Sequence, residues 1–341
     1  MYAQDYDYFR DHVSANEGYS MKICVVGAGA IGCWFGAWMA RAGHEVSLLA
    51  RGAHLEALQA DGLKFEDGDK RETFVVRAAS EPADLGRHDL VLLGLKAYSI
   101  AGMLPRLAPL LGPDTIVMPA INGLPWWYFY KEGGRFDGST ISCLDRNGDM
   151  FAALDPSHLI GCVVHGSAEV VAPGVVRHNS GDRYIVGEPD GGMSPRILAL
   201  AEAMRAAGFD APVTPRIREE IWTKLAGNLS YNPIAALTLA RMDEINANAA
   251  LLDVIRPMIA ETIAVAAAYG VTIPVTVEER IGIARKIGRA KISMHQDVER
   301  GRPLETDGII GSVVELARRA GAATPVTGMV LALIEERARH I

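Results

Sequence analysis

The sequence predicts an α/β protein: a doubly wound parallel sheet in the N-terminal part, followed by an all-helical C-terminal domain. Three observations carry this prediction. An apolar run ends in closely spaced glycines, short apolar runs then alternate with helix-like sequence, and little strand-like sequence remains beyond Pro215. Such alternation is typical of a parallel sheet with helices on its faces. We therefore expect an N-terminal extension of 1–20, a dinucleotide-binding domain of 21–215 and a helical domain of 216–341.

The first strand is expected at Ile23 to Val26, and it leads directly into the sequence GAGAIG at 27–32. The spacing G-x-G-x-x-G between a strand and a helix is typical of Rossmann-type dinucleotide-binding domains. Gly27 permits the tight turn, Gly29 lets a pyrophosphate approach the backbone, and Gly32 lets the helix pack against the strand. The candidate cofactor-binding residues of this loop are Gly27, Ala28, Gly29, Ala30, Ile31 and Gly32.

The end of the second strand indicates which dinucleotide binds. After a helix at 33–42, this strand covers 45–50 and is followed by Arg51. An NAD site usually carries Asp or Glu here to bind the ribose 2′-hydroxyl. Arginine cannot accept that hydrogen bond but can pair with a 2′-phosphate, so the sequence favours NADP(H). The alternative is an ordinary exposed arginine at a strand end.

Two polar residues follow later strands of the same domain. Further strands are expected at 74–78, 89–94, 115–119, 161–165 and 184–187. Lys96 and Asn122 lie just beyond the carboxyl ends of two of them, where open α/β sheets bind ligands. The alternative for both is a cap or turn, which is common for a pair such as Asn122-Gly123.

The helical domain opens with a polar stripe. Helices are expected at 217–239, 251–269, 277–287, 308–320 and 325–339, and the first carries Lys224, Asn228 and Asn232. Because these residues are four apart, an ammonium and two amides share one helix face over roughly 12 Å. Such a stripe suits a small oxygen-rich anion, whereas the alternative is a solvated polar face. We expect the binding site between the two domains.

Composition restricts the function classes. The chain has 341 residues, and its net charge of -7 argues against a nucleic-acid-binding protein. No apolar run reaches the roughly 18 residues expected of a membrane helix. The four cysteines form neither a CxxC pair nor a cluster with histidine, so no metal site is expected. These features are typical of a cytoplasmic enzyme without a membrane partner.

The N-terminal extension of 1–20 is polar, acidic and rich in tyrosine. It lacks the basic start and the apolar stretch of a signal peptide. Either it is a disordered or docking tail, or Met21 is the true start of the protein.

Together, these motifs resemble the ketopantoate reductase (2-dehydropantoate 2-reductase) family from Met21 onwards. The resemblance rests on GAGAIG, on Leu-Lys-Ala around Lys96, on Asn-Gly at Asn122 and on the helix motif W-x-K-L-x-x-N-x-x-x-N-P. It also includes SMHQD at 293–297 and ETD at 305–307. The resemblance implies reduction of ketopantoate to pantoate with NADPH, as in pantothenate biosynthesis.

The resemblance also implies roles for single residues. Lys224 becomes the proton donor, and Glu305, which its spacing alone would make a solvated charge, becomes a second catalytic residue. The implied substrate contacts are Lys224, Asn228, Asn232, Ser293 and Asn122. The implied cofactor contacts outside the glycine loop are Arg51, Lys96, Asn122 and Glu305. The chemistry is consistent, because a lysine ammonium can stabilise and protonate the oxygen that becomes negative when hydride adds to a 2-oxo acid.

Two features depart from the family pattern. Met242 stands where the family often carries another substrate-binding asparagine. The stretch between Asn122 and Gly161 is longer than in compact members and contains the aromatic run Trp126 to Tyr130. This insertion at 125–160 could be a lid or a wall of the substrate pocket that tunes substrate choice. The alternative is a surface hairpin packed on the sheet.

Two other functions stay open. One is an NADP-dependent reductase of another 2-oxo acid, or a 3-hydroxy acid dehydrogenase, on a related scaffold. The other is a non-catalytic NADPH-binding sensor, which would typically have lost the proton donor that Lys224 provides here. The helical domain could support a homodimer, but no motif specifies one.

Overall fold

The computed structural model describes residues 20–341, which divide into two compact units. The first comprises the described residues up to Leu95, together with Ser99–Ile121 and Ala153–Ile217. The second comprises Lys96–Tyr98, Asn122–Ala152 and Arg218–Ile341. The structure thus assigns to the second unit two segments that the sequence boundary at 215 left in the first. The predicted extension lies outside the described residues, apart from Ser20.

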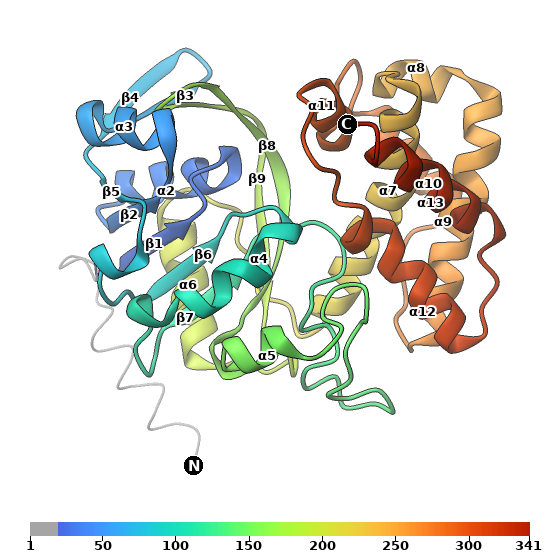
Figure 1. Cartoon of the computed structure of the whole chain (residues 1–341), viewed down its shortest axis with the longest axis horizontal. Helices are drawn as coiled ribbons and strands as arrows, with labels where there is room; N and C mark the ends of the chain where they lie inside the picture. The colour runs from blue at the N-terminus through green and yellow to red at the C-terminus, as the bar shows by residue number, and fades with distance from the viewer. Residues whose placement is uncertain (1–19) are drawn as a thin grey trace. The chain divides into compact units, whose positions relative to one another are not determined.

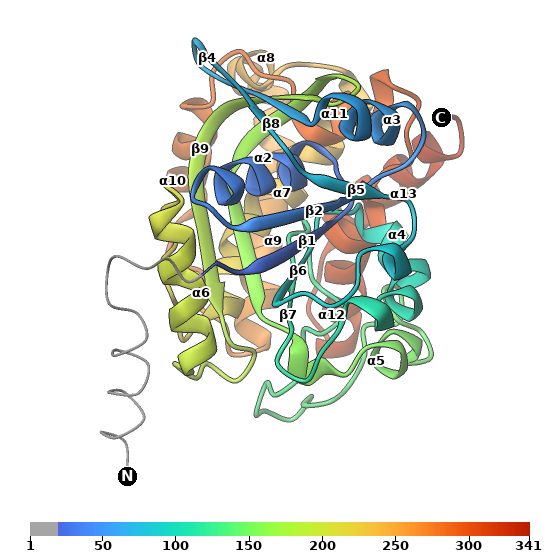
Figure 2. The same cartoon turned by 90° about the vertical axis from the view of Figure 1, so that its left-hand side faces the viewer.

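The first unit contains a parallel sheet, formed within the described residues by five strands in the order β5–β2–β1–β6–β7. These strands are β1 (Lys22–Val26), β2 (Glu45–Leu49), β5 (Arg77–Ala79), β6 (Leu90–Leu93) and β7 (Ile116–Pro119). Figure 2 shows them side by side. The central strand β1 is apolar and buried beyond its first residue, as expected for a strand covered on both faces. The predicted doubly wound sheet is confirmed.

Outside its strands, the first unit contains helices and short turns of helix. The helices are α2 (Ala30–Arg41), α3 (Gly52–Asp61), α4 (Ala97–Met103) and α6 (Pro195–Ala206). The 3-10 turns are η1 (Pro82–Asp84), η2 (Leu104–Arg106), η3 (Ala108–Leu110) and η4 (Pro156–His158). Helix α4 begins in the second unit and continues into the first.

The later strands form a second sheet instead of extending the first, which corrects the sequence prediction. The segments at 161–165 and 184–187 are the ends of two long antiparallel strands, β8 (Gly161–Ala172) and β9 (Val175–Gly187). With β3 (Leu63–Asp67) and β4 (Lys70–Phe74) they make a sheet of order β4–β3–β9–β8. The strand predicted at 74–78 is also wrong, because this segment ends β4 and begins β5.

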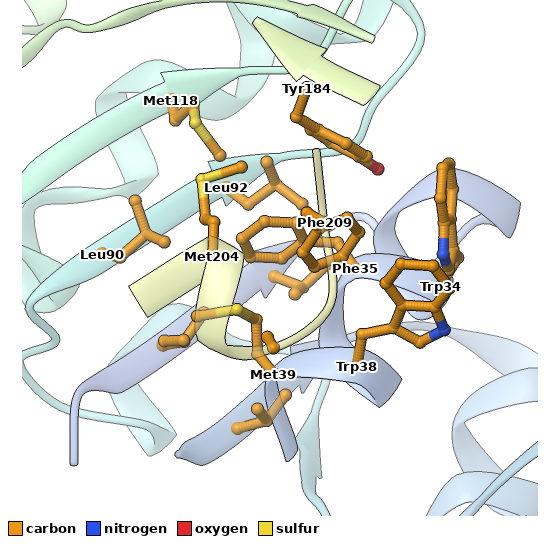
Figure 3. Packing of buried hydrophobic residues seen from close by; sticks show 14 of the residues in the cluster. Trp34, Phe35, Trp38, Met39, Leu90, Leu92, Met118, Tyr184, Met204 and Phe209 are labelled. Carbon is orange, nitrogen blue, oxygen red and sulfur yellow. The ribbon is translucent and has the colours of Figure 1, made fainter. Parts of the chain in front are cut away.

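Helix α2 packs between the two sheets of the first unit. A Cβ on Gly36 would lie only 3.2 Å from Cγ1 of Val46, so the helix approaches β2 closely. On its other side Trp34 stacks on His178 of β9, with ring centroids 4.7 Å apart, and packs edge-on against Tyr184 at 5.2 Å. A helix without a solvent face is expected to be apolar all round, as α2 is. The core drawn in Figure 3 also contains Phe35, Trp38 and Phe209.

The second unit is mainly helical, as predicted. Figure 1 shows its long helices from yellow to red. They are α7 (Ile217–Thr238), α8 (Met242–Ala247), α9 (Ala249–Ala268), α10 (Val277–Arg285), α11 (Ser293–Glu299), α12 (Ser312–Ala320) and α13 (Pro325–Ala338). A π-helical turn, η5 (Asp307–Gly311), precedes α12, and a short helix α5 (Asp149–Ala153) lies within the inserted segment. The sequence did not predict α8 and α11, because neither is long enough to display a helical period.

The aromatic run of the insertion belongs to the core of the second unit. The side chains of 126–129 are at most 3% exposed. The indole Nε1 of Trp222 in α7 donates to Oη of Tyr128 at 2.6 Å, and Arg218 donates to the backbone carbonyls of Tyr128 and Tyr130. Residues 122–152 contain no strand. The run is therefore neither a lid nor a surface hairpin.

Within residues 20–341, no helix is both long and apolar enough to cross a membrane. The same residues contain no group of three or more His, Cys, Asp or Glu side chains arranged to hold a metal ion.

Candidate functional site

The glycine loop between β1 and α2 has one position that the fold leaves open. Gly27 has φ +98°, a backbone conformation that residues with a side chain rarely adopt. A Cβ on Gly32 would lie 2.5 Å from the carbonyl oxygen of Gly27 and 2.6 Å from Cγ1 of Val25. At Gly29 the nearest atom to a Cβ would be the carbonyl oxygen of Gly94 at 3.7 Å, an ordinary contact. The fold therefore requires Gly27 and Gly32, whereas a bare Gly29 suits the close approach of a ligand.

The start of α2 offers donors to such a ligand. Gly29 is the N-cap residue, and the amide of Cys33 makes the first helical hydrogen bond to its carbonyl at 2.8 Å. The N–H groups of the three residues between them have no partner within the helix. The first turn carries no acidic residue. These donors and the helix dipole fit the pyrophosphate of a dinucleotide.

Arg51 lies where the sequence places it, two residues beyond the end of β2 and at the N-cap position of α3. Its side chain is exposed and forms no ion pair with any residue from 20 to 341. The first turn of α3 also lacks acidic residues. The arrangement fits a phosphate on the ribose.

In the second unit, the ammonium of Lys96 lies between two buried carboxylates. It donates to Oδ2 of Asp297 at 2.7 Å and to Oε2 of Glu305 at 3.0 Å. Oε1 of Glu305 accepts from the backbone N–H of Ala97 at 3.1 Å. Burial alone would lower the pKa of Lys96, but the charges and hydrogen bonds of the two carboxylates raise it above its ordinary value. Glu305 is therefore a buried partner of Lys96 and not a solvated charge.

Asp297 is a member of this group that the sequence did not single out. Its side chain is 6% exposed, and it lies on α11 one turn after Ser293, which is partly buried. The signal was present in the motif SMHQD, where a carboxylate follows the serine at helical spacing. Spacing alone could not reveal that Lys96 is its partner.

The polar stripe of α7 faces the protein and is not a solvated surface. Lys224 and Asn228 are partly buried, and Asn232 is 4% exposed. Nδ2 of Asn228 donates to Oδ1 of Asn122 at 3.4 Å, so two predicted site residues from distant segments meet. The amide of Asn232 has no side-chain hydrogen bond to any other described residue.

The Asn-Gly turn at 122 packs directly on the π-helical turn η5. Gly123 has φ +86°, and a Cβ there would overlap the carbonyl of Gly308. That carbonyl accepts from the N–H of Leu124 at 2.8 Å. Because Glu305 lies just before η5, this close contact fixes the Asn122 turn relative to the Lys96–Glu305 pair. Single π-helical turns are frequent at functional sites.

Met242, the departure from the family pattern, is a core residue. It is 1% exposed, and its N–H donates to the carbonyl of Ala290 at 3.0 Å. This contact joins the start of α8 to the segment that leads into Ser293.

The site residues of the second unit thus combine two cations, two carboxylates and several neutral amides. The ammonium of Lys224 and the amides of Asn228 and Asn232 on one helix face can bind an anion and donate a proton to it.

Comparison with known proteins gives consistent matches to one family. Residues 23–132 match the family model described as "Ketopantoate reductase PanE/ApbA", and residues 216–338 match "Ketopantoate reductase PanE/ApbA C terminal". The chain is 44% identical to a 2-dehydropantoate 2-reductase of Mesorhizobium japonicum, over 93% of this chain and 98% of that protein. It is 30% identical to one of Halobacterium salinarum, over 90% and 95% of the two chains.

Solved structures agree with these matches. A candidate ketopantoate reductase from Ralstonia solanacearum superposes with a TM-score of 0.89 at 38% identity, covering 94% of this chain and 98% of that one. A D-mandelate dehydrogenase, solved with NADH and anilino(oxo)acetate, reaches a TM-score of 0.80 at 21% identity, covering 94% and 99% of the two chains. At that identity the likeness concerns the fold alone.

Proposed function

The chain belongs to the ketopantoate reductase family, and on this premise we propose that it reduces ketopantoate to pantoate with NADPH, as in pantothenate biosynthesis. As a member of this family it is an oxidoreductase acting on a CH–OH group. The main support for this function is the stripe of Lys224, Asn228 and Asn232 on one partly buried face of α7. Asn122 lies at hydrogen-bonding distance from Asn228 in this stripe.

Two features of the first unit support the choice of cofactor. The open Gly29 and the N–H groups at the start of α2 would bind the pyrophosphate, and Arg51 would pair with the 2′-phosphate. When bound, NADPH supplies the hydride that adds to the 2-oxo carbon of the substrate. An exposed Arg51 with no carboxylate partner among residues 20–341 is what favours NADPH over NADH.

In this proposal, Lys224 carries the proton-transfer step. Its ammonium lies beside the carbonyl oxygen, stabilises the negative charge that develops there and donates the proton that completes the alcohol. Asn228, Asn232 and Ser293 hydrogen-bond the hydroxyl and carboxylate of the substrate without adding charge. Asn232 is buried and the other two are partly buried, which makes each of these interactions stronger than it would be in water.

Glu305 and Lys96 act as a pair. Lys96 balances the charge of the buried Glu305, and the N–H of Ala97 fixes the orientation of the carboxylate. The pair therefore forms a fixed polar group next to the turn that carries Asn122.

Reduction of a different 2-oxo acid is the second candidate function. The observation that favours it is Met242, a buried thioether at the position where the family often carries a substrate-binding asparagine. A smaller or more apolar 2-oxo acid would not need the hydrogen bond that an asparagine at position 242 would make.

The test is turnover of ketopantoate, followed by the loss of NADPH absorbance and repeated with NADH. We expect NADPH-selective turnover that falls by about 100-fold or more in Lys224→Ala, because general acid catalysis contributes that much. Lys286→Ala removes an exposed lysine of the same unit and should behave as wild type. Full activity in Lys224→Ala would contradict the proton-donor role. Turnover only with other 2-oxo acids in a substrate panel would establish the second candidate.

A further inference from the structure

Arg280, on α10, lies against the bare backbone of α7. A Cβ built on Gly227 would overlap the guanidinium, with Nε only 2.5 Å away. The guanidinium therefore occupies the space that a side chain at position 227 would fill. Gly227 lies inside a long helix, where glycine is otherwise unfavourable. The absence of a side chain here lets the arginine approach.

Position 227 shares a helix face with part of the candidate site. Residues 224, 227, 228 and 231 follow the spacing i, i+3, i+4 and i+7, which places them next to one another on a helix. The guanidinium therefore contacts α7 at Gly227, which is next to Lys224 on the helix surface. The next residue of this face is Tyr231, which is 2% exposed.

The guanidinium of Arg280 has no hydrogen-bond acceptor among residues 20–341, and its Nε is buried. The neighbouring Arg256, in contrast, pairs with both Glu278 and Asp253. The phenol of Tyr231 does not supply a negative charge, because its hydroxyl donates to Oδ1 of Asn246 at 2.9 Å and burial raises its pKa to about 12. Buried cations in proteins are normally paired, so Arg280, which has no carboxylate partner among residues 20–341, is suited to bind an anion.

We propose that Arg280 binds the carboxylate of the 2-oxo acid substrate, an inference that rests on the proposed function. The carboxylate keeps its charge before and after hydride transfer, whereas Lys224 is needed at the carbonyl oxygen. Asn228, Asn232 and Ser293 can donate hydrogen bonds to the carboxylate but are uncharged, so a second cation beside them would balance its charge. A guanidinium fits that task, because its planar donors can bind both carboxylate oxygens.

Two variants remove the contact in different ways. Arg280→Met removes the guanidinium. Gly227→Ala keeps Arg280 but displaces its guanidinium, and alanine is favoured over glycine inside a helix, so this variant should remain folded. Arg285→Met is the matched control, because Arg285 is an exposed arginine of the same helix and the change in net charge is identical.

The first measurement compares ketopantoate with ketopantoyl lactone, in which the carboxylate is esterified. We expect Arg280→Met and Gly227→Ala to raise KM for ketopantoate about tenfold or more, with kcat little changed, because the interaction is equal in ground and transition states. KM for the lactone and both constants of Arg285→Met should match wild type. Equal losses with ketopantoate and lactone would indicate a structural role and overturn the inference.

A second measurement does not depend on turnover. The affinity of the enzyme for 2-oxoisovalerate, a simple 2-oxo carboxylate, is determined calorimetrically with and without NADP⁺. If wild type fails to reduce ketopantoate but binds 2-oxoisovalerate in a manner that needs Arg280, the proposed substrate is wrong and the carboxylate site stands. If both variants bind and turn over like wild type, the carboxylate site is wrong.

Discussion

The ammonium of Lys96 lies 3.0 Å from the carboxylate of Glu305, although the two residues are 209 positions apart. The carboxylate is 4% exposed and also accepts from the N–H of Ala97. A second buried carboxylate, that of Asp297, contacts the same ammonium at 2.7 Å. One ammonium is therefore shared by two buried carboxylates. Replacing Lys96 leaves both carboxylates without their cation, whereas replacing either carboxylate leaves Lys96 with the other one.

Replacing Glu305 should separate its two interactions. Glu305→Leu removes the partner of Lys96 and the acceptor for Ala97, and we expect it to cost about 3 kcal/mol or more of unfolding free energy. Glu305→Gln keeps an amide oxygen that can accept from Ala97, and Lys96 retains Asp297, so this variant should cost clearly less. Urea unfolding measures the unfolding free energy of both variants. Glu335→Leu, which replaces an exposed glutamate, is the control. Equal midpoints for Glu305→Leu and wild type would contradict the expectation.

The same ion pairs predict loss of stability at alkaline pH. The pKa of Lys96 is raised above its ordinary value of 10.5, so the charged form is favoured by folding. This stabilisation is complete below the ordinary pKa and is lost as the pH rises through the elevated one. The melting temperature of wild type should therefore fall more steeply above about pH 10 than that of Lys96→Met. Parallel curves for the two proteins would show that the pairs contribute nothing.

The sequence predicted local features of the site and missed the distant ones. The stripe of Lys224, Asn228 and Asn232 follows from helical period alone, and the glycine loop follows from the order of strand, turn and helix. Glu305 has no such local signature, because Lys96 and Ala97 lie about two hundred positions away. Only the family resemblance promoted it, and Asp297 was not singled out.

The second sheet was missed for a related reason. Beyond its first four residues, β8 is exposed or partly buried, and the outer part of β9 is similar except for the buried Val176. These halves lack a continuous apolar run, so only the buried ends of the hairpin were recognised as strands. The pairing of β9 with β3 joins segments more than a hundred residues apart, which no local pattern encodes.

Two alanine substitutions in the glycine loop should affect different properties, one the affinity for NADPH and the other the stability of the fold. Gly29→Ala should remain folded, because its Cβ would make only an ordinary contact, yet NADPH affinity should fall about tenfold or more as the methyl group meets the pyrophosphate. Gly32→Ala should lower the melting temperature, because its Cβ would overlap Gly27 and Val25. Gly102→Ala meets no atom within 4 Å and serves as control. Undiminished NADPH affinity in Gly29→Ala would place the phosphates elsewhere.

Arg51 should determine the choice between the two nicotinamide cofactors. Arg51→Ala removes an exposed side chain without an ion pair in the described part of the chain, so stability should not change. The dissociation constant of NADPH should rise about tenfold or more, while that of NADH stays the same, because only NADPH carries the 2′-phosphate. Titration of both cofactors by fluorescence checks this. An equal effect on both would mean that Arg51 does not contact the 2′-phosphate.

The insertion should govern stability and not substrate choice. Oη of Tyr128 accepts the indole N–H of Trp222, and both side chains are fully buried. Tyr128→Phe leaves that N–H without its acceptor, which we expect to cost about 1–3 kcal/mol of unfolding free energy. Tyr130→Phe, in the same run but only partly buried, should cost much less. Urea unfolding of both variants gives the comparison.

Turnover separates this structural role from a role in the substrate pocket. If Tyr128 only supports the core, the ratio of kcat/KM for ketopantoate to that for 2-oxoisovalerate should be the same in Tyr128→Phe as in wild type. A changed ratio without loss of stability would make the aromatic run a wall of the pocket. We expect the constant ratio, because the phenol is directed at Trp222 and burial raises its pKa to about 12, which keeps it neutral over the working range of the enzyme.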